Sequence, residues 1–299
     1  MEPNQKSAFV AIVGRPNVGK SSLLNAFVGE KVAIVTEKPQ TTRTRITGIL
    51  TRQETQLVFI DTPGIHKPKT KLSEYMVKQV RESVADVDVA VLVTEPTGGI
   101  RETELALLDS FRQRRLPAIL AVNKIDTLAH KDQMLEKLQA FSALFDFDEI
   151  IPISALMLDG VDILLEKLCT YAVPGPHYFD DDAYTDQPER VLVAEMVREK
   201  LLLCMREEIP HGTAVVAEEM KERPGKELMD ITVTIFCERE SHKGMIIGKK
   251  GEMLKTIASR SRSDIEAFLG LPVNLQCWVK VKEDWRNREG SIRYLGFRN

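Results

Sequence analysis

The chain has 299 residues, of which 43% are hydrophobic and 28% are charged, and its formal net charge is −3. This length predicts two domains, and this composition excludes a disordered, collagen-like or disulfide-scaffold protein. A uniformly basic nucleic-acid-binding protein is excluded as well. The segment 242–299 nevertheless holds 12 Lys and Arg against 6 Asp and Glu, which indicates either a solvated basic face or a surface for a polyanion.

The first 173 residues alternate between short apolar runs and amphipathic helical patterns, which predicts an α/β fold with a mainly parallel sheet covered on both faces. The connections between parallel strands should be right-handed. Strands are predicted at 9–13, 57–60, 87–93, 118–122 and 150–153, and helices at 21–28, 72–84, 102–114, 132–144 and 161–171.

A proline-rich and acidic stretch without apolar periodicity follows, so we interpret 174–189 as a linker. It separates a first domain, 1–173, from a second domain, 190–299. The second domain has the predicted order α-β-β-α-α-β, an α+β arrangement, and ends in a basic tail. Its helices are predicted at 189–206 and up to 269, its strands at 213–220, 230–237 and 274–282, and its tail at 285–299.

The remaining sequence signals concern the cellular compartment. The four cysteines form no Cys-x-x-Cys pair, so a cysteine metal site is not expected, and the thiols should be reduced in a cytoplasmic protein. The N-terminus carries no secretory signal pattern, and the longest apolar runs are far shorter than the about 20 residues of a membrane span. Peripheral contact with the inner face of the cell membrane stays open.

A phosphate-binding loop is predicted between the first strand and the first helix, where the sequence matches G-x-x-x-x-G-K-[ST]. Glycines let such a loop wrap around phosphate oxygens, which then face backbone N–H groups and a helix N-terminus. We expect Lys20 to bridge the β- and γ-phosphates and Ser21 to ligate Mg²⁺. The predicted contacts are Gly14, Arg15, Pro16, Asn17, Val18, Gly19, Lys20, Ser21 and Ser22.

Two further segments are expected to face the γ-phosphate. Asp61 follows an apolar strand and could hold Mg²⁺ through a water, while the Gly64 N–H could meet the γ-phosphate. In the polar stretch 39–43, Thr42, favoured over Thr41, could complete the Mg²⁺ shell when the γ-phosphate is present and so order this loop. The predicted contacts of the segment that begins at Asp61 are Asp61, Thr62, Pro63, Gly64 and Ile65. The predicted catalytic set is Lys20, Thr42 and Gly64.

The base-binding signals follow the next strands. The Asp126 carboxylate can accept hydrogen bonds from the N1–H and the N2 amino group of guanine, whereas adenine would leave its charge unpaired. The predicted base contacts are Asn123, Lys124, Asp126, Ser154, Ala155 and Leu156, with a backbone N–H after Ser154 available for the guanine O6. All these motifs fall at the carboxyl ends of strands, the edge at which open α/β sheets bind ligands.

An RNA-binding loop of the G-x-x-G type is predicted in the second domain. Such a loop lets the backbone of single-stranded RNA approach closely, and lysines at its tip contact phosphates. Helix residues beyond it, such as Arg260 and Arg262, could add contacts. The predicted RNA contacts are Gly248, Lys249, Lys250 and Gly251 in the loop, Ile246 and Ile247 bordering an apolar groove for bases, and Lys255 on the next helix.

Together these motifs resemble a Ras-like P-loop GTPase domain of the translation-factor class, followed by a type II KH domain. In this order they resemble the Era family of bacterial GTPases from about residue 9 to 297, with further matching stretches at 39–43, 278–282 and 295–297. The resemblance implies GTP hydrolysis with Mg²⁺, binding of the 3′ end of 16S rRNA, and a role in assembly of the small (30S) ribosomal subunit; no DNA partner is expected. It also implies a K⁺ ion at Asn17, unless that side chain only shapes the loop.

The hydrolytic step departs from the usual pattern. A glutamine that orients the attacking water often follows the glycine at position 64, but here Ile65 cannot hydrogen-bond and His66 comes one position late. Slow intrinsic hydrolysis is therefore expected. Two other interpretations stay open. The chain could be an RNA-binding module whose nucleotide pocket only stabilises the fold, and measurable GTP turnover would exclude this. It could also be a GTPase that acts on membranes or in tRNA modification, which the KH pattern and the lack of a C-terminal cysteine nucleophile disfavour.

Overall fold

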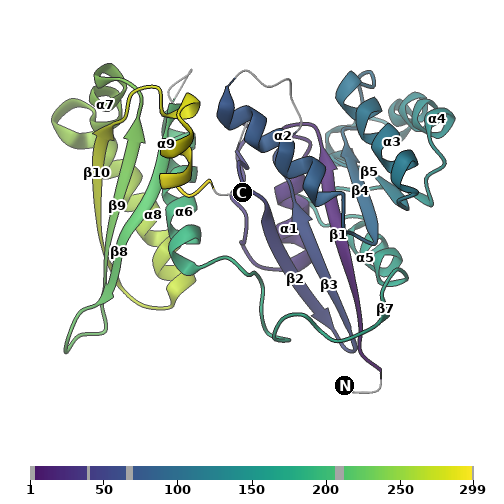
Figure 1. Ribbon diagram of the computed structural model, residues 1–299, viewed down its shortest axis with the longest axis horizontal. Helices are drawn as coiled ribbons and strands as arrows, with labels where there is room; N and C mark the ends of the chain where they lie inside the picture. The colour runs from purple at the N-terminus through teal and green to yellow at the C-terminus, as the bar shows by residue number, and fades with distance from the viewer. Residues whose placement is uncertain (1–3, 39–40, 65–69, 206–211, 298–299) are drawn as a thin grey trace. The chain divides into compact units, whose positions relative to one another are not determined.

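The computed structural model describes residues 4–38, 41–64, 70–205 and 212–297. The chain divides into two compact units, with the main boundary between Asp186 and Gln187. Figure 1 labels the helices and strands of both units.

The first unit is built on a mainly parallel sheet with the strand order β2-β3-β1-β4-β5-β6, which confirms the predicted fold class. The predicted strands are all present, and β2, which the prediction lacked, adds an antiparallel edge next to β3. The short β7 pairs with β1. The strands are β1 Lys6–Gly14, β2 Ile46–Arg52, β3 Thr55–Asp61, β4 Val89–Thr94, β5 Ala118–Val122, β6 Glu149–Pro152 and β7 Val173–Pro174.

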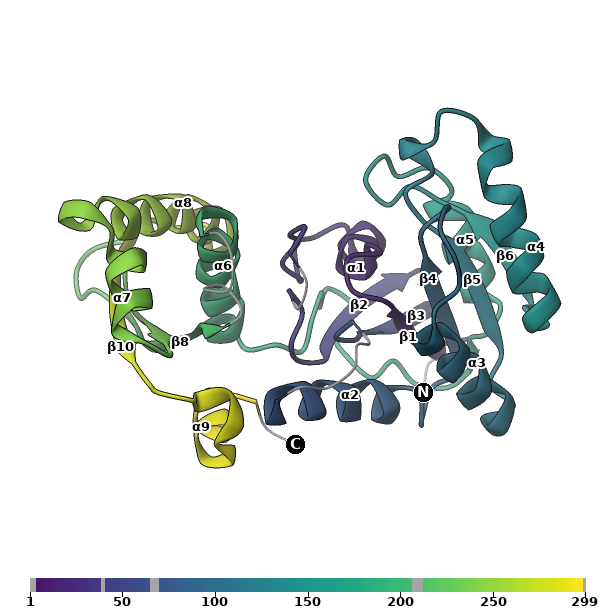
Figure 2. The same cartoon turned by 90° about the horizontal axis from the view of Figure 1, so that it is seen from above.

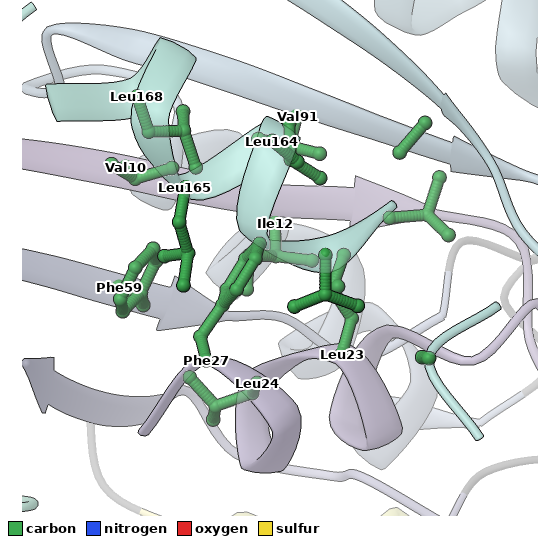
Figure 3. Packing of buried hydrophobic residues seen from close by; sticks show 14 of the residues in the cluster. Val10, Ile12, Leu23, Leu24, Phe27, Phe59, Val91, Leu164, Leu165 and Leu168 are labelled. Carbon is green, nitrogen blue, oxygen red and sulfur yellow. The ribbon is translucent and has the colours of Figure 1, made fainter. Parts of the chain in front are cut away.

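Alternation along the central strand β1 directs side chains into two hydrophobic cores. Ile12 belongs to the core that α1 and α5 cover (Figure 3), whereas its neighbour Val13 belongs to the core that α2, α3 and α4 cover. Figure 2 shows α1 and α2 on opposite sides of the sheet. The helices of this unit are α1 Lys20–Val28, α2 Lys71–Ser83, α3 Glu102–Arg114, α4 Leu135–Leu144 and α5 Val161–Cys169.

Much of the predicted linker packs against the first unit. We call residues 177–185 the strap. The buried side chain of Gln56 donates a hydrogen bond to the carbonyl of Phe179 at 3.0 Å, and the Ile49 N–H donates to the carbonyl of Tyr184 at 2.9 Å. These contacts explain why the first unit extends to Asp186 rather than ending before the acidic stretch.

The second unit has the predicted order α-β-β-α-α-β. Its sheet has the order β10-β9-β8, in which β10 is parallel and β8 antiparallel to β9. Residues of α6 and α8 such as Val197 and Ile257 pack with Ile231 of β9 in one core. The elements are α6 Glu189–Cys204, β8 Ala214–Glu222, β9 Met229–Cys237, α7 Glu240–Ile247, α8 Glu252–Leu269 and β10 Val273–Val281.

Residues 285–297, which the sequence predicts only as a basic tail, form packed structure. Trp285 is 0% exposed, its indole N–H donates to the carbonyl of Gly212 at 2.9 Å, and its ring stacks on Phe297 with a centroid distance of 5.8 Å. A short helix, α9 Glu289–Tyr294, lies between these two aromatic residues in the sequence. The basic residues of this segment lie between the buried aromatic residues Trp285 and Phe297, and a count of charges cannot reveal this packing.

None of the helices in the described ranges combines the length and the apolar character needed to cross a membrane.

Candidate functional site

The loop between β1 and α1 has backbone geometry that suits glycine at two positions. Gly14 has φ 152° and Gly19 has φ 96°, both in a region that side-chain-bearing residues rarely adopt. A Cβ atom at Gly14 would collide with the carbonyl oxygen of Val93, and one at Gly19 with the side-chain amide of Asn123. The loop is therefore held close to the ends of the neighbouring strands, which positions its backbone N–H groups.

Lys20 begins α1 and lies inside the loop. Its ammonium group donates a hydrogen bond to the carbonyl oxygen of Arg15 at 2.8 Å. Burial lowers the pKa of Lys20 to about 8, and the negative charge of Asp61 opposes this shift. The side chain is therefore mostly protonated at neutral pH, so a buried cation is ready where the sequence predicts phosphate oxygens.

The three predicted Mg²⁺ ligands meet beside this lysine. The Ser21 hydroxyl donates to Asp61 Oδ2 at 2.7 Å and lies 2.8 Å from the hydroxyl oxygen of Thr42. Burial raises the pKa of Asp61 to about 6, although Lys20 and the hydrogen bonds to the carboxylate oppose the shift. Thr41 instead contacts Thr36 at 2.6 Å, which agrees with the preference for Thr42.

These residues fit a magnesium ion. Asp61 Oδ1 is buried and accepts no hydrogen bond from any residue in the described ranges, so one carboxylate oxygen lacks compensation for its burial. Hydroxyl and carboxylate oxygens are the hard ligands that Mg²⁺ takes alongside phosphates and waters. Ser21 and Thr42 would hold the ion directly, and Asp61 would hold it through a water.

The base-binding motif is tied to the phosphate loop. The side-chain amide of Asn123 donates to the carbonyl of Val18 at 2.8 Å, and its oxygen accepts the N–H of Ala155 at 2.9 Å. Ser154 donates its hydroxyl to Asp126 Oδ1 at 2.5 Å, and Asp126 itself is exposed. Asn123 thus links the end of β5 to the phosphate loop and to the loop after β6. Ser154 orients the Asp126 carboxylate, which is exposed and can accept further hydrogen bonds.

The segment after β3 also lies against its predicted neighbours. Thr62 donates its hydroxyl to the carbonyl of Ile12 at 3.0 Å, which anchors the chain just before Gly64. A Cβ atom at Gly64 would lie 2.5 Å from the Cα atom of Pro16, so this glycine touches the phosphate loop. Ile65 and His66 lie outside the described residues.

Two acidic residues of this site were missed by sequence reasoning. Glu95 directly follows β4 and lies 2.7 Å from the ammonium group of Lys124, and Glu104 is buried in the first turn of α3. The position of Glu95 after a strand end is the signal that could have identified it. Leu156, which was predicted to approach the base, is 80% exposed.

The G-x-x-G loop joins α7 to α8. Gly248 has φ 73°, and a Cβ atom there would lie 2.6 Å from Cβ of Met253, so this position accepts only glycine without rearrangement. Lys250 also has a positive φ, 52°, and both Lys249 and Lys250 are exposed. The loop therefore presents two ammonium groups to solvent next to Gly248, where the loop backbone lies close to the backbone of Met253.

The apolar residues beside this loop differ from the prediction. Ile246 is 0% exposed and belongs to the hydrophobic core, so it does not border an accessible groove. Ile247 is partly exposed and Lys255 is exposed. Met245, which sequence reasoning did not select, is 51% exposed and offers an apolar surface next to the loop. The helical period places 245 and 246 on different faces, and this signal was available in the sequence.

The fold and these two sites define a P-loop GTPase domain joined to a KH domain. Residues 9–124 match the family described as 50S ribosome-binding GTPase, and residues 208–286 match the KH domain family. GTPase Era of Clostridioides difficile (strain 630) is 50% identical over 292 residues, which cover 98% of each chain. GTPase Era of Ruminiclostridium cellulolyticum is 47% identical over 293 residues, with 98% of each chain covered. The chain therefore belongs to the Era family of GTPases.

Solved structures agree with this assignment. A crystal structure of an Aquifex aeolicus Era variant bound to GDP and AlF4⁻ has a TM-score of 0.94 and 38% sequence identity, and the match covers 99% of this chain and 100% of that chain. A second structure, of Era in complex with MgGDPNP and nucleotides 1506–1542 of 16S ribosomal RNA, has a TM-score of 0.93, also with 38% identity.

Proposed function

We propose that this chain binds and hydrolyses GTP, and that its nucleotide state governs how the KH unit binds the 3′ end of 16S rRNA during assembly of the small ribosomal subunit. The convergence of Ser21, Thr42 and Asp61 beside the buried Lys20 carries the nucleotide part of the proposal. The Era structure that contains 16S rRNA nucleotides supports the RNA part. Release of phosphate from GTP by the purified chain tests the enzymatic activity and excludes a pocket that only stabilises the fold.

The residues of this pocket would support both nucleotide binding and switching. Loop N–H groups and Lys20 would hold the phosphates, while Thr42 and the Gly64 N–H would approach the γ-phosphate from two separate segments. Mg²⁺, when bound, offsets the charge of the phosphates. Loss of the γ-phosphate would release both segments, so the chain would act as a timer.

The KH loop makes the RNA part testable with a charge reversal. We expect the double substitution Lys249→Asp and Lys250→Asp to remove RNA binding, because two phosphate contacts become repulsive. Aspartate tolerates the positive φ of position 250, so the loop should keep its shape. Filter retention of an RNA that carries the 3′ end of 16S rRNA measures the effect.

The matched control is Lys226→Asp, which makes the same kind of charge change at an exposed turn of the same unit. It should leave RNA retention nearly unchanged. Affinity for GTP should be unchanged in both variants. Normal RNA retention by the double variant would contradict the proposed role of the loop.

Potassium is proposed as an additional activator of hydrolysis. Asn17 has φ 63°, and its amide nitrogen donates to the carbonyl of Glu37 at 2.5 Å, which fixes the side chain and leaves its oxygen for a cation. A K⁺ ion beside the β- and γ-phosphates would supply part of the charge that an arginine finger provides elsewhere. We expect faster GTP turnover in KCl than in NaCl at equal ionic strength, and equal rates in both salts would reject this role.

We also propose that the chain acts in the cytoplasm. Peripheral contact with the inner face of the cell membrane stays a prediction from the sequence.

A further inference from the structure

Arg15 connects the phosphate loop to residues outside it. Its carbonyl oxygen accepts the hydrogen bond from Lys20. Its guanidinium group extends to two carboxylates beyond the loop: Nε lies 3.3 Å from Glu104 Oε1, and Nη2 lies 3.7 Å from Glu95 Oε2. The loop carbonyl that holds Lys20 is therefore attached, through one side chain, to the end of β4 and the start of α3.

Glu104 is the more constrained of the two carboxylates. Its side chain is 0% exposed, and it accepts hydrogen bonds from the Thr94 hydroxyl at 3.0 Å and from the Arg101 N–H at 2.8 Å. A buried carboxylate needs a positive partner in addition to neutral donors. Arg15 Nε is buried and makes no hydrogen bond with the described residues, so the attraction between the two side chains is ionic rather than an aligned hydrogen bond.

Glu95 joins the two halves of the nucleotide site. One of its oxygens lies 2.7 Å from the ammonium group of Lys124, and the other faces Arg15. Since Glu95 and Lys124 are both partly exposed, solvent weakens this pair, and we assign it the smaller contribution. The buried pair of Arg15 and Glu104 is expected to dominate.

We propose that Glu104 is a positioning residue for phosphate binding. It holds Arg15 in place, and thereby fixes the Arg15 carbonyl oxygen to which Lys20 donates its hydrogen bond. Glu95 extends this link to Lys124. The inference rests on the proposed function. When a triphosphate attracts Lys20 away from that carbonyl, the anchored Arg15 keeps the loop open and in place. The site then binds nucleotide without first reordering its loop, which favours affinity.

The test is a double-substitution cycle on nucleotide affinity. We expect Glu104→Gln to raise the dissociation constant for GDP about 10-fold, because the charge that holds Arg15 is lost. Arg15→Met should give a similar rise, and the double variant should be no worse than either single variant. The KM for GTP should rise in the same proportion, while kcat at saturating GTP should change less, since bound phosphates themselves order the loop.

Asp109→Asn is the matched control, because Asp109 lies on the same helix and pairs with Arg112 on its exposed face. It should leave both kinetic constants unchanged. Glutamine has one acceptor oxygen, so it cannot replace both carboxylate oxygens that accept the Arg101 N–H and the Thr94 hydroxyl, and Glu104→Gln is expected to lower the melting temperature. Arg15→Met tests the same link from a partly exposed position.

Strictly additive losses in the cycle, or an unchanged GDP dissociation constant in Arg15→Met, would overturn the positioning role. Either result could be obtained with a wild-type chain that binds and hydrolyses GTP normally, so this inference and the proposed function fail separately. Wild-type protein without GTP turnover would instead contradict the function itself.

Discussion

Replacing Lys20 with alanine should abolish measurable binding of both GTP and GDP. The ammonium group is buried beside Asp61, inside the loop that is predicted to hold the phosphates. Without it, the phosphates would face the Asp61 carboxylate with only backbone N–H groups to offset their charge. Charge-assisted hydrogen bonds to phosphate are among the strong ones, so we expect a loss of at least about 100-fold in affinity, or ~3 kcal/mol.

Titration with a fluorescent GDP analogue measures this loss. Lys167→Ala serves as the control, because Lys167 is a lysine of α5 that faces Glu149 at 3.7 Å, where both side chains are partly exposed. The control should bind nucleotide like the wild type, and both variants should retain RNA through the KH unit. Nucleotide affinity within a few-fold of wild type in Lys20→Ala would show that the loop does not hold the phosphates as described.

The second large effect is a change of base preference in Asp126→Asn. A carboxylate accepts two hydrogen bonds from guanine, whereas an asparagine amide offers one acceptor and one donor. Xanthine carries a carbonyl where guanine carries its amino group, so it matches the amide. We expect affinity for GTP to fall, and that for xanthosine triphosphate to rise, by roughly two orders of magnitude each.

Ser154 should favour this change of base preference. Its hydroxyl already donates to Asp126 Oδ1, and an asparagine oxygen at that place can accept the same bond. Competition between the two triphosphates for a labelled nucleotide measures the preference. Asp132→Asn, at an exposed position after the same strand, is the control and should keep the preference for GTP. Equal affinities in Asp126→Asn would contradict the assignment of the base site.

The nucleotide site was predictable because its chemistry is local in the sequence. The phosphate loop and Lys20 follow β1, Asp126 follows β5, and strand ends of a parallel sheet meet at one edge. The tight contact of Ser21 with Thr42 and Asp61 follows from that meeting. What could not be predicted is the ionic link from Arg15 to Glu104, because their pairing depends on how α3 packs rather than on any spacing along the chain.

The elements that the prediction lacked are stabilised by tertiary contacts. β2 has the sequence ITGILTR, in which threonines and a glycine interrupt the apolar run, and its place in the sheet depends on pairing with β3. Residues after Trp285 are rich in charge, and their order comes from Trp285 and Phe297 stacking against each other. Likewise, nothing in the composition of the strap indicates that Gln56 would bind its backbone. In each case packing overrides a polar local sequence.

The strap also links the segment around Thr42 to the start of α6 through few residues. Thr42 stands four positions before the start of β2 at Ile46, and the Thr47 carbonyl of that strand accepts the hydroxyl of Thr185 at 2.6 Å. Four positions after Thr185, Glu189 begins α6. The segment around Thr42 and the first turn of α6 are therefore joined through one hydrogen-bonded strand edge and a few peptide units.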